Sequence, residues 1–314
     1  MSEQVRFVVP DADDGLRLDQ ALARHVPGLS RRRAKVLLEI GGVFVDKARV
    51  KVAGRLVRAG QTVEANRGGA LERAAAEGVG AAARDRTDAA LPPFRVVFED
   101  EHLIVVDKPA GLVTAPTPES DRGNLLDMLL RRPDAGTVYL VHRIDLPTSG
   151  LVVFARTSDA NRALADRFAA HDVERAYVAV VRGVWPETVT TVTQPVQGKR
   201  AVTHVLAREV VAGGAATIMR FGLETGRTHQ IRIHATATGH PVFGDHQHGG
   251  GGAMPEEVRR APRPPRLALH AALLGFVHPA TGETVRWESP LPDDLTTWLD
   301  ALRLAAPAAE EPAS

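Results

Sequence analysis

The sequence predicts an α+β protein, with a small N-terminal α/β domain and a larger domain built on a mixed, mainly antiparallel sheet. Between residues 93 and 302, strand-like runs rich in Val, Ile and Phe follow one another closely, and only a few helical segments interrupt them. This order favours an antiparallel meander over a βαβ series. Between residues 67 and 91 the composition changes to glycine, alanine and charge without an aromatic. Such a stretch is typical of a linker between two domains.

The small domain is expected over residues 16–66. Apolar residues recur at helical spacing from Leu18 onwards, which predicts a first helix. A second helix is expected from Ser30, a good N-cap, to the glycine pair at 41–42, which ends it. The remaining segments have the pattern of short strands around a turn.

Basic residues concentrate in this small domain, although the formal net charge of the whole chain is only +1. The second helix carries Arg31, Arg32, Arg33 and Lys35 in one run. Such a run is either a solvated helix face or a contact for nucleic acid, because the distribution of charge matters more than its sum. If the domain binds RNA, these four residues are the expected contacts.

The composition excludes several kinds of chemistry. The 314 residues include no cysteine, so disulfides, thiolate nucleophiles and cysteine zinc sites are ruled out. No apolar run reaches the roughly 18 residues of a membrane span, and the first fifteen residues lack the pattern of a secretory signal. We therefore expect a cytoplasmic protein.

The larger domain is expected over residues 92–304. Helices are predicted at 124–132 and 158–171, the second beginning at a Ser or Asp cap. The glycine- and proline-rich segment 246–265 is typical of an irregular surface loop. The tail 305–314, rich in Ala, Glu and Pro, is expected to be disordered.

Asp145 lies in a loop between two apolar, strand-like runs. A carboxylate in a loop is most often a turn former. Here Pro147 and Gly150 constrain the loop, and the hydroxyls of Thr148 and Ser149 are expected to bond its backbone. The pattern therefore also fits a single reactive group held rigidly at the edge of a cleft.

A second segment, GRTHQIRIHATATGHP, has the alternation of a strand but the punctuation of a helix. Thr228 is a good N-cap and Gly239 a good helix exit, so we predict a helix over 229–238. Its first turn, flanked by Arg227 and containing Arg232, would attract an anion. The alternative is a surface helix with two solvated arginines.

Two motifs carry a resemblance to a known family. HRIDLPTSG (142–150) matches in full the signature of the RluA-like RNA pseudouridine synthases, and GRTHQIRIH…GHPVFGD matches the second long motif of that family. DKPAGL (107–112), the Arg175-Ala176-Tyr177 triplet and later landmarks follow in the order of the family. The resemblance covers 93 to about 290, and residues 16–66 resemble an S4 domain, a small RNA-binding module.

The resemblance implies an isomerase that converts chosen uridines in structured RNA to pseudouridine and needs no cofactor. It assigns Asp145 as the essential carboxylate, Tyr177 as the ring that stacks on uracil, and Arg232 as the partner of Asp145. Four more residues are expected at the substrate: Ile231 and Leu269 lining the base pocket, Arg143 filling the stack that the flipped base leaves, and Arg227 contacting an anion.

Histidines need a separate interpretation. After Asp245 the family often continues towards Tyr-Gly, where this chain has HQHGGGG. His240, His246 and His248 suggest a metal site, but without a cysteine or a spaced carboxylate we expect no metal. Four other histidines are expected to be hydrogen-bonded structural members of the motifs: His142, His229, His234 and His270.

The substrate and two other functions stay open at this point. The S4 resemblance favours large-subunit ribosomal RNA over transfer RNA as the partner of a monomeric enzyme. A non-catalytic RNA-binding protein is the main alternative, and the presence of Asp145, Tyr177 and Arg232 argues against it. A metal-dependent hydrolase that uses the histidine-rich loop is a third interpretation.

Overall fold

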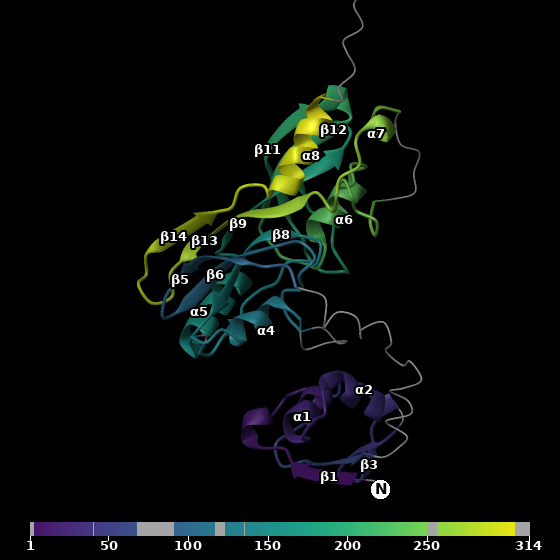
Figure 1. Cartoon of the computed structure of the whole chain (residues 1–314), viewed down its shortest axis with the longest axis vertical. Coiled ribbons are helices and arrows are strands. Elements are labelled where there is room, and N and C mark those ends of the chain that lie inside the picture. The colour runs from purple at the N-terminus through teal and green to yellow at the C-terminus, as the bar shows by residue number, and fades with distance from the viewer. Residues whose placement is uncertain are drawn as a thin grey trace, which may run out of the picture. The chain divides into compact units, whose positions relative to one another are not determined.

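The computed structural model describes residues 3–39, 41–67, 91–116, 123–134, 136–249 and 256–304. Contacts between residues divide the chain into two compact units. One holds a four-stranded sheet and the other a ten-stranded sheet (Figure 1). The predicted α+β class is confirmed. The expected linker and the expected disordered tail fall almost entirely outside the described residues.

The four-stranded sheet is antiparallel and has the order β1-β4-β2-β3. Both predicted helices and the predicted short strands are present, whereas β1 precedes the residues expected to form this unit. The elements are β1 (Glu3–Val8), the 3-10 turn η1 (Asp11–Asp13), α1 (Leu18–His25), α2 (Arg31–Glu39), β2 (Val43–Val45), β3 (Ala48–Arg49) and β4 (Thr62–Arg67).

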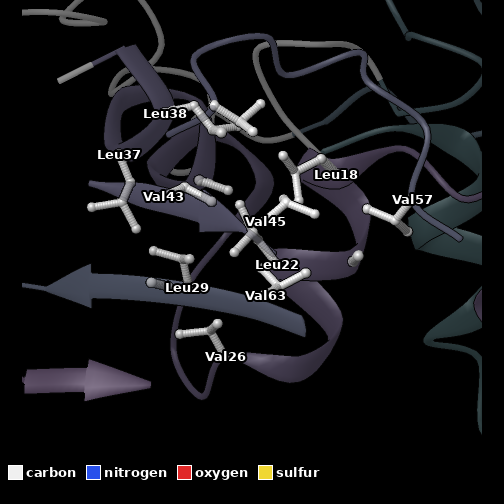
Figure 2. Packing of buried hydrophobic residues seen from close by; sticks show 14 of the residues in the cluster. Leu18, Leu22, Val26, Leu29, Leu37, Leu38, Val43, Val45, Val57 and Val63 are labelled. Carbon is white, nitrogen blue, oxygen red and sulfur yellow. The ribbon is translucent and has the colours of Figure 1, made fainter. Parts of the chain in front are cut away.

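Apolar side chains from the two helices and the sheet form the core of this unit (Figure 2). Leu22 of α1, Leu37 of α2 and Val63 of β4 are all fully buried. Each such side chain contributes about 1.5–3 kcal/mol when it leaves water. As expected, Ser30 caps α2, because its Oγ accepts the backbone N–H of Arg33 at 3.3 Å. The helical spacing in the sequence therefore corresponds to the buried face.

The ten-stranded sheet is antiparallel throughout its described strands except where β8 and β13 run parallel. Its order is β10-β11-β12-β9-β13-β8-β6-β5, with β14 paired to β13 and β7 to β8. The strands are β5 (Arg95–Glu99), β6 (Leu103–Lys108), β7 (Tyr139–Leu140), β8 (Ser149–Ala155), β9 (Glu174–Arg182), β10 (Thr191–Val192), β11 (Thr203–Val211), β12 (Ala216–Leu223), β13 (Leu269–Val277) and β14 (Thr284–Glu288).

The helices associated with this part of the chain match the predictions only in part. They are α4 (Leu125–Leu130), α5 (Ser158–Ala169), the short turn η3 (Ala212–Gly214), α6 (Gln230–Ala237), α7 (Glu256–Arg260) and α8 (Asp293–Leu304). The helix at 229–238 is confirmed as α6, while α8 was not predicted. Helix α7 lies inside the segment expected to be an irregular loop. No helix of the described residues is long and apolar enough to cross a bilayer.

Two predicted helix caps are wrong. Thr157 caps α5 by accepting the N–H of Ala160 at 3.2 Å, instead of the expected Ser or Asp that follows it. Helix α6 starts from His229, which has a left-handed backbone (φ 58°) and makes no side-chain cap. Thr228 is therefore not the N-cap. The left-handed residue turns the chain sharply into the helix.

Gly150 brings β8 close to β13. Its φ is +113°, and a Cβ there would lie 2.2 Å from the backbone oxygen of Ala271. Only glycine fits both the conformation and the close approach. The loop that carries Asp145 ends directly before this contact, so the strand pair fixes one end of the loop.

Candidate active site

A cleft of about 570 Å³ lies among the loop before β8, strand β9, the first turn of α6 and the start of β13. It brings together all the catalytic and substrate-binding residues that the sequence predicted. These are Asp145, Tyr177, Arg232, Arg143, Arg227, Ile231 and Leu269. They come from segments up to 126 positions apart in the chain, from Arg143 to Leu269.

The loop that carries Asp145 is held by backbone bonds and by a neighbouring threonine. The N–H of Thr148 donates to the backbone oxygen of Asp145 at 3.1 Å, and Thr114 Oγ1 donates to the oxygen of Ile144 at 2.8 Å. The expectation that the hydroxyls of Thr148 and Ser149 bond this backbone is wrong. Thr148 Oγ1 is buried without a hydrogen-bond partner, and Ser149 Oγ bonds Nδ1 of His270 at 2.9 Å.

Arg232 connects two carboxylates. Its Nε and Nη2 donate to the two oxygens of Asp245, both at 2.8 Å, and its Nη1 lies 3.5 Å from Oδ2 of Asp145. The side chain of Asp145 is 20% exposed, whereas that of Asp245 is fully buried. The guanidinium is thus fixed by one carboxylate and directed towards the other.

Asp245 was not predicted as a site residue. Burial alone would raise its pKa, but the hydrogen bonds from Arg232 and from the backbone N–H groups of His248 and Gln247 lower that pKa to about 2. Asp245 is therefore ionised at neutral pH and balances the charge of Arg232. It belongs to the second long motif, which was the available signal.

Tyr177 lies on β9 and is 9% exposed. Burial raises the pKa of its phenol, while the adjacent Arg175 acts in the opposite direction. The phenol is therefore neutral at neutral pH. With Ile231 and Leu269 it gives the cleft an aromatic and aliphatic wall. Such a wall can stack on a base without holding it in one orientation.

Lys108 was missed by sequence reasoning as part of the site. It is fully buried, and its Nζ donates to the backbone oxygens of Pro109 and Leu112, both at 2.8 Å, and approaches that of Leu146 at 3.5 Å. Burial lowers its pKa to about 7, although the charge of Asp145 acts to raise it. The amine ties the DKPAGL turn to the loop of Asp145.

The histidines act mainly as hydrogen-bonding groups. Nε2 of His142 accepts the N–H of Val153 at 3.1 Å. His234 contacts Thr203 and the oxygen of Gln194. Together with the bond between His270 and Ser149, these contacts confirm the structural interpretation of those three. Within the described residues, no three His, Cys, Asp or Glu side chains are grouped as a metal site requires.

The four basic residues expected to contact RNA all lie on α2. Arg31 donates to Asp19 Oδ2 at 3.2 Å, and its side chain is only 18% exposed. That arginine therefore has a partner inside its own unit. Arg33 and Lys35 are partly exposed.

Comparison with known proteins identifies the family of the chain. Residues 102–237 match the RNA pseudouridylate synthase family and residues 16–63 match the S4 domain. A protein of Nitrosomonas europaea named "Ribosomal large subunit pseudouridine synthase D" is 38% identical over 95% of this chain and 88% of its own. One of the same name from Pseudomonas aeruginosa is 37% identical over 94% of both chains.

A solved structure named "Human RNA Pseudouridylate Synthase Domain Containing 1" is similar in fold. It has a TM-score of 0.51 and 26% identity, over 72% of this chain and 99% of its own. The chain belongs to the RNA pseudouridylate synthase family, and it carries an S4 domain at its N-terminus. It is an isomerase that converts uridine in RNA to pseudouridine.

Proposed function

We propose that this enzyme isomerises specific uridines of large-subunit ribosomal RNA and that Asp145 is its essential carboxylate. The names of its relatives and the S4 match support that RNA. We further propose that it acts in the cytoplasm as a monomer without a cofactor. In this proposal residues 16–66 bind RNA, 67–91 link the domains and 92–304 carry the reaction.

The arrangement around Asp145 is the observation that carries this proposal. A partly exposed carboxylate lies at a cleft with a fixed guanidinium at 3.5 Å. The guanidinium stabilises the ionised form, which is the nucleophilic or basic form of the group. In this arrangement Asp145 is the reactive carboxylate. Asp245 is not, since it is buried and neutralises the charge of Arg232.

The reaction requires the target uracil to leave the RNA helix and to rotate. A uridine in structured RNA has to be flipped out before its glycosidic bond is reached. The N1–C1′ bond then breaks, the uracil rotates, C5 bonds to C1′, and the proton of C5 leaves while N1 takes up a proton. Tyr177, Ile231 and Leu269 would hold the uracil by stacking and apolar contact, which tolerate this rotation. Arg143 would fill the vacated stack, and Arg227 would contact a phosphate.

Mapping pseudouridines in a strain that lacks the gene tests the proposed substrate. We expect one or more sites to disappear from large-subunit ribosomal RNA and to return when the wild-type gene is restored, but not with an Asp145→Asn copy. Sites that disappear only from transfer RNA would contradict the proposed substrate and leave the reaction intact. If every site persists, the proposal fails.

A further inference from the structure

His229 lies close to the carboxylate of Asp145 and is in contact with a second histidine, His248. Nε2 of His229 is 3.8 Å from Asp145 Oδ2. On the other side of the same ring, Nδ1 of His229 is 2.9 Å from Nε2 of His248. The two rings cross at 70° with centroids 5.0 Å apart. None of the steps described above uses either ring.

His248 is itself fixed in place. Its backbone N–H donates to Asp245 Oδ1 at 2.9 Å, and its backbone oxygen accepts from Thr236 Oγ1 at 2.8 Å. Asp245 is the carboxylate that fixes Arg232. The same aspartate therefore positions both groups that approach Asp145, the guanidinium directly and the imidazole through His248.

The hydrogen bond between the rings admits two tautomers of neutral His229, and the carboxylate of Asp145 favours the one with its proton on Nε2. One ring has to donate, and donation from Nε2 of His248 places the single proton of neutral His229 on Nε2. That nitrogen faces the carboxylate, so the proton meets an acceptor. The opposite tautomer would direct a lone pair at an anion. A hydrogen bond on one ring nitrogen thus decides what the other nitrogen offers.

The backbone at His229 also indicates a functional constraint. This residue has φ 58° and ψ 22°, a left-handed conformation uncommon outside glycine, at the entry to α6. Such strain persists where the surrounding structure requires it, and it is frequent at active sites. Here it places the imidazole between Asp145 and His248.

We propose that His229, held by His248, is a positioning residue that presents Nε2–H to the Asp145 carboxylate. This inference rests on the proposed role of Asp145. The present separation is longer than a hydrogen bond. Contacts of this kind are often long in a free enzyme and shorten when the substrate binds.

Burial, more than the surrounding charges, favours a neutral donor at His229. The titratable and charged groups that act on it are Asp145 from the loop before β8, Arg232 from α6, and Asp245 and His248 from the segment after α6. Burial lowers the pKa of His229; Asp145 and Asp245 oppose this, whereas Arg232 and His248 add to it. A neutral imidazole can orient the carboxylate beside Arg232 without adding a second cation.

Substitutions at both histidines test the proposal in the full-length enzyme, with tritium release from 5-³H-uridine RNA as the assay. Asparagine is tolerated in left-handed backbone and is too short to reach Asp145, so His229→Asn removes the donor without adding strain. His248→Phe removes the bond to Nδ1, whereas His248→Gln places an amide N–H near the position of Nε2 and can still donate to it. His246→Phe is the matched control, since His246 is exposed.

We expect His229→Asn and His248→Phe to lower kcat by about 10- to 100-fold, the effect of one hydrogen bond to a charged group. KM should stay within about threefold, because neither ring is needed to hold the RNA. His248→Gln should retain most of the wild-type rate, and His246→Phe should behave like the wild type.

Several results would overturn the proposal. These are wild-type kcat in His229→Asn, a loss confined to KM, equal losses in His248→Phe and His248→Gln, or a comparable loss in His246→Phe. Nitrogen-15 NMR of His229 supplies a readout that needs no substrate, because the Nε2–H tautomer should be present in wild type and lost in His248→Phe. If the wild type were inactive on ribosomal RNA, the proposed substrate would be wrong. The tautomer of His229 seen by NMR would still test whether His248 holds His229 as proposed.

Discussion

Arg232 is held against Asp245 by two parallel hydrogen bonds of 2.8 Å, and this pairing leaves Nη1 of Arg232 facing Asp145 at 3.5 Å. A two-point contact fixes the plane of a guanidinium as well as its position. Asp245 therefore orients the group that stabilises the charge of the proposed catalytic carboxylate, although it does not itself contact Asp145.

Replacing Asp245 by Asn should lower both the free energy of unfolding and the catalytic rate, because Arg232 would lose the contact that orients it. The change leaves the buried Arg232 with only the partly exposed Asp145 nearby, and removing the buried partner costs about 3–5 kcal/mol in the free energy of unfolding. Urea unfolding measures this loss. Asp294→Asn is a matched control, because Asp294 also makes a two-point contact, with Arg266, but its side chain is 43% exposed. The control should lose about 1 kcal/mol or less, and equal losses would contradict the importance of burial.

The pH dependence of this pair follows from the lowered pKa of Asp245. In the folded protein the pKa is about 2, below the ordinary value of 3.8. The stabilising contribution is therefore complete above pH 4 to 5 and is lost as the pH falls towards 2. The difference in unfolding free energy between wild type and Asp245→Asn should be constant from pH 5 to 7 and should shrink below pH 4.

The sequence predicted residues that all line one cleft, because they lie in motifs that the fold brings together. It missed those whose role depends on contacts made across the fold. Lys108 becomes part of the site only because its Nζ reaches Leu146, 38 positions away. Thr114 supports Ile144 across 30 positions, a contact that loop chemistry alone assigned to Thr148 and Ser149.

Elements were missed for related reasons. Strand β11 runs from Thr203 to Val211 and is mostly exposed along its middle, so its sequence lacks the regular alternation of a half-buried strand. The cap of α6 was misplaced because Thr228 has the better intrinsic preference for that position. The structure instead uses His229 in a left-handed conformation, and tertiary contacts override propensity there.

Lys108 should make the free energy of unfolding depend on pH in the alkaline range. Burial lowers its pKa to about 7 in the folded protein, below the ordinary 10.5. Between these values the unfolded chain binds more protons, so folding stability rises with pH, by at most about 1.4 kcal/mol per unit. In Lys108→Met this rise should disappear. Urea unfolding of both proteins from pH 7 to 10 measures it, and parallel curves would show that the amine is not buried in the way described.

Two substitutions of Tyr177 distinguish stacking by its ring from a role of its hydroxyl. Tyr177→Phe keeps the ring that would stack on uracil and removes only the hydroxyl, whereas Tyr177→Leu removes the ring. If stacking dominates, Leu should raise KM and lower kcat/KM by about 10- to 100-fold, the cost of one stacked base of 1–3 kcal/mol. Steady-state tritium release measures both variants. A larger loss in Phe than in Leu would instead make the phenol hydroxyl the important group.

The basic helix α2 should contribute to RNA affinity through its partly exposed residues Arg33 and Lys35. Arg33→Ala with Lys35→Ala should weaken binding and reduce the slope of log K against log salt by about 1.4–1.8, because each phosphate contact contributes about 0.7–0.9. Arg31→Ala should act mainly on stability, since Arg31 bonds Asp19. Filter binding from 50 to 200 mM salt measures the slope. An unchanged slope in the double variant would place the RNA contacts elsewhere.

Exchanging Asp145 for Asn should abolish the isomerisation and leave fold and RNA affinity nearly intact. The side chain keeps its size, but the charge and the reactive oxygen are lost, and an amide replaces neither. The loss of unfolding free energy should be about 1 kcal/mol or less, because Arg232 remains paired with Asp245 and Asp145 is partly exposed. Circular dichroism and filter binding separate stability and affinity from chemistry.

The decisive measurement for this variant is tritium release from 5-³H-uridine RNA under single-turnover conditions. C5 loses its hydrogen when the glycosidic bond moves there, so the label reports completed isomerisation and not binding. We expect turnover below about a thousandth of the wild type, the scale lost with an essential catalytic group. His246→Phe serves again as the control on the same RNA. Turnover well above that level in Asp145→Asn would mean that another group carries the reaction, and the assignment of Asp145 would be wrong.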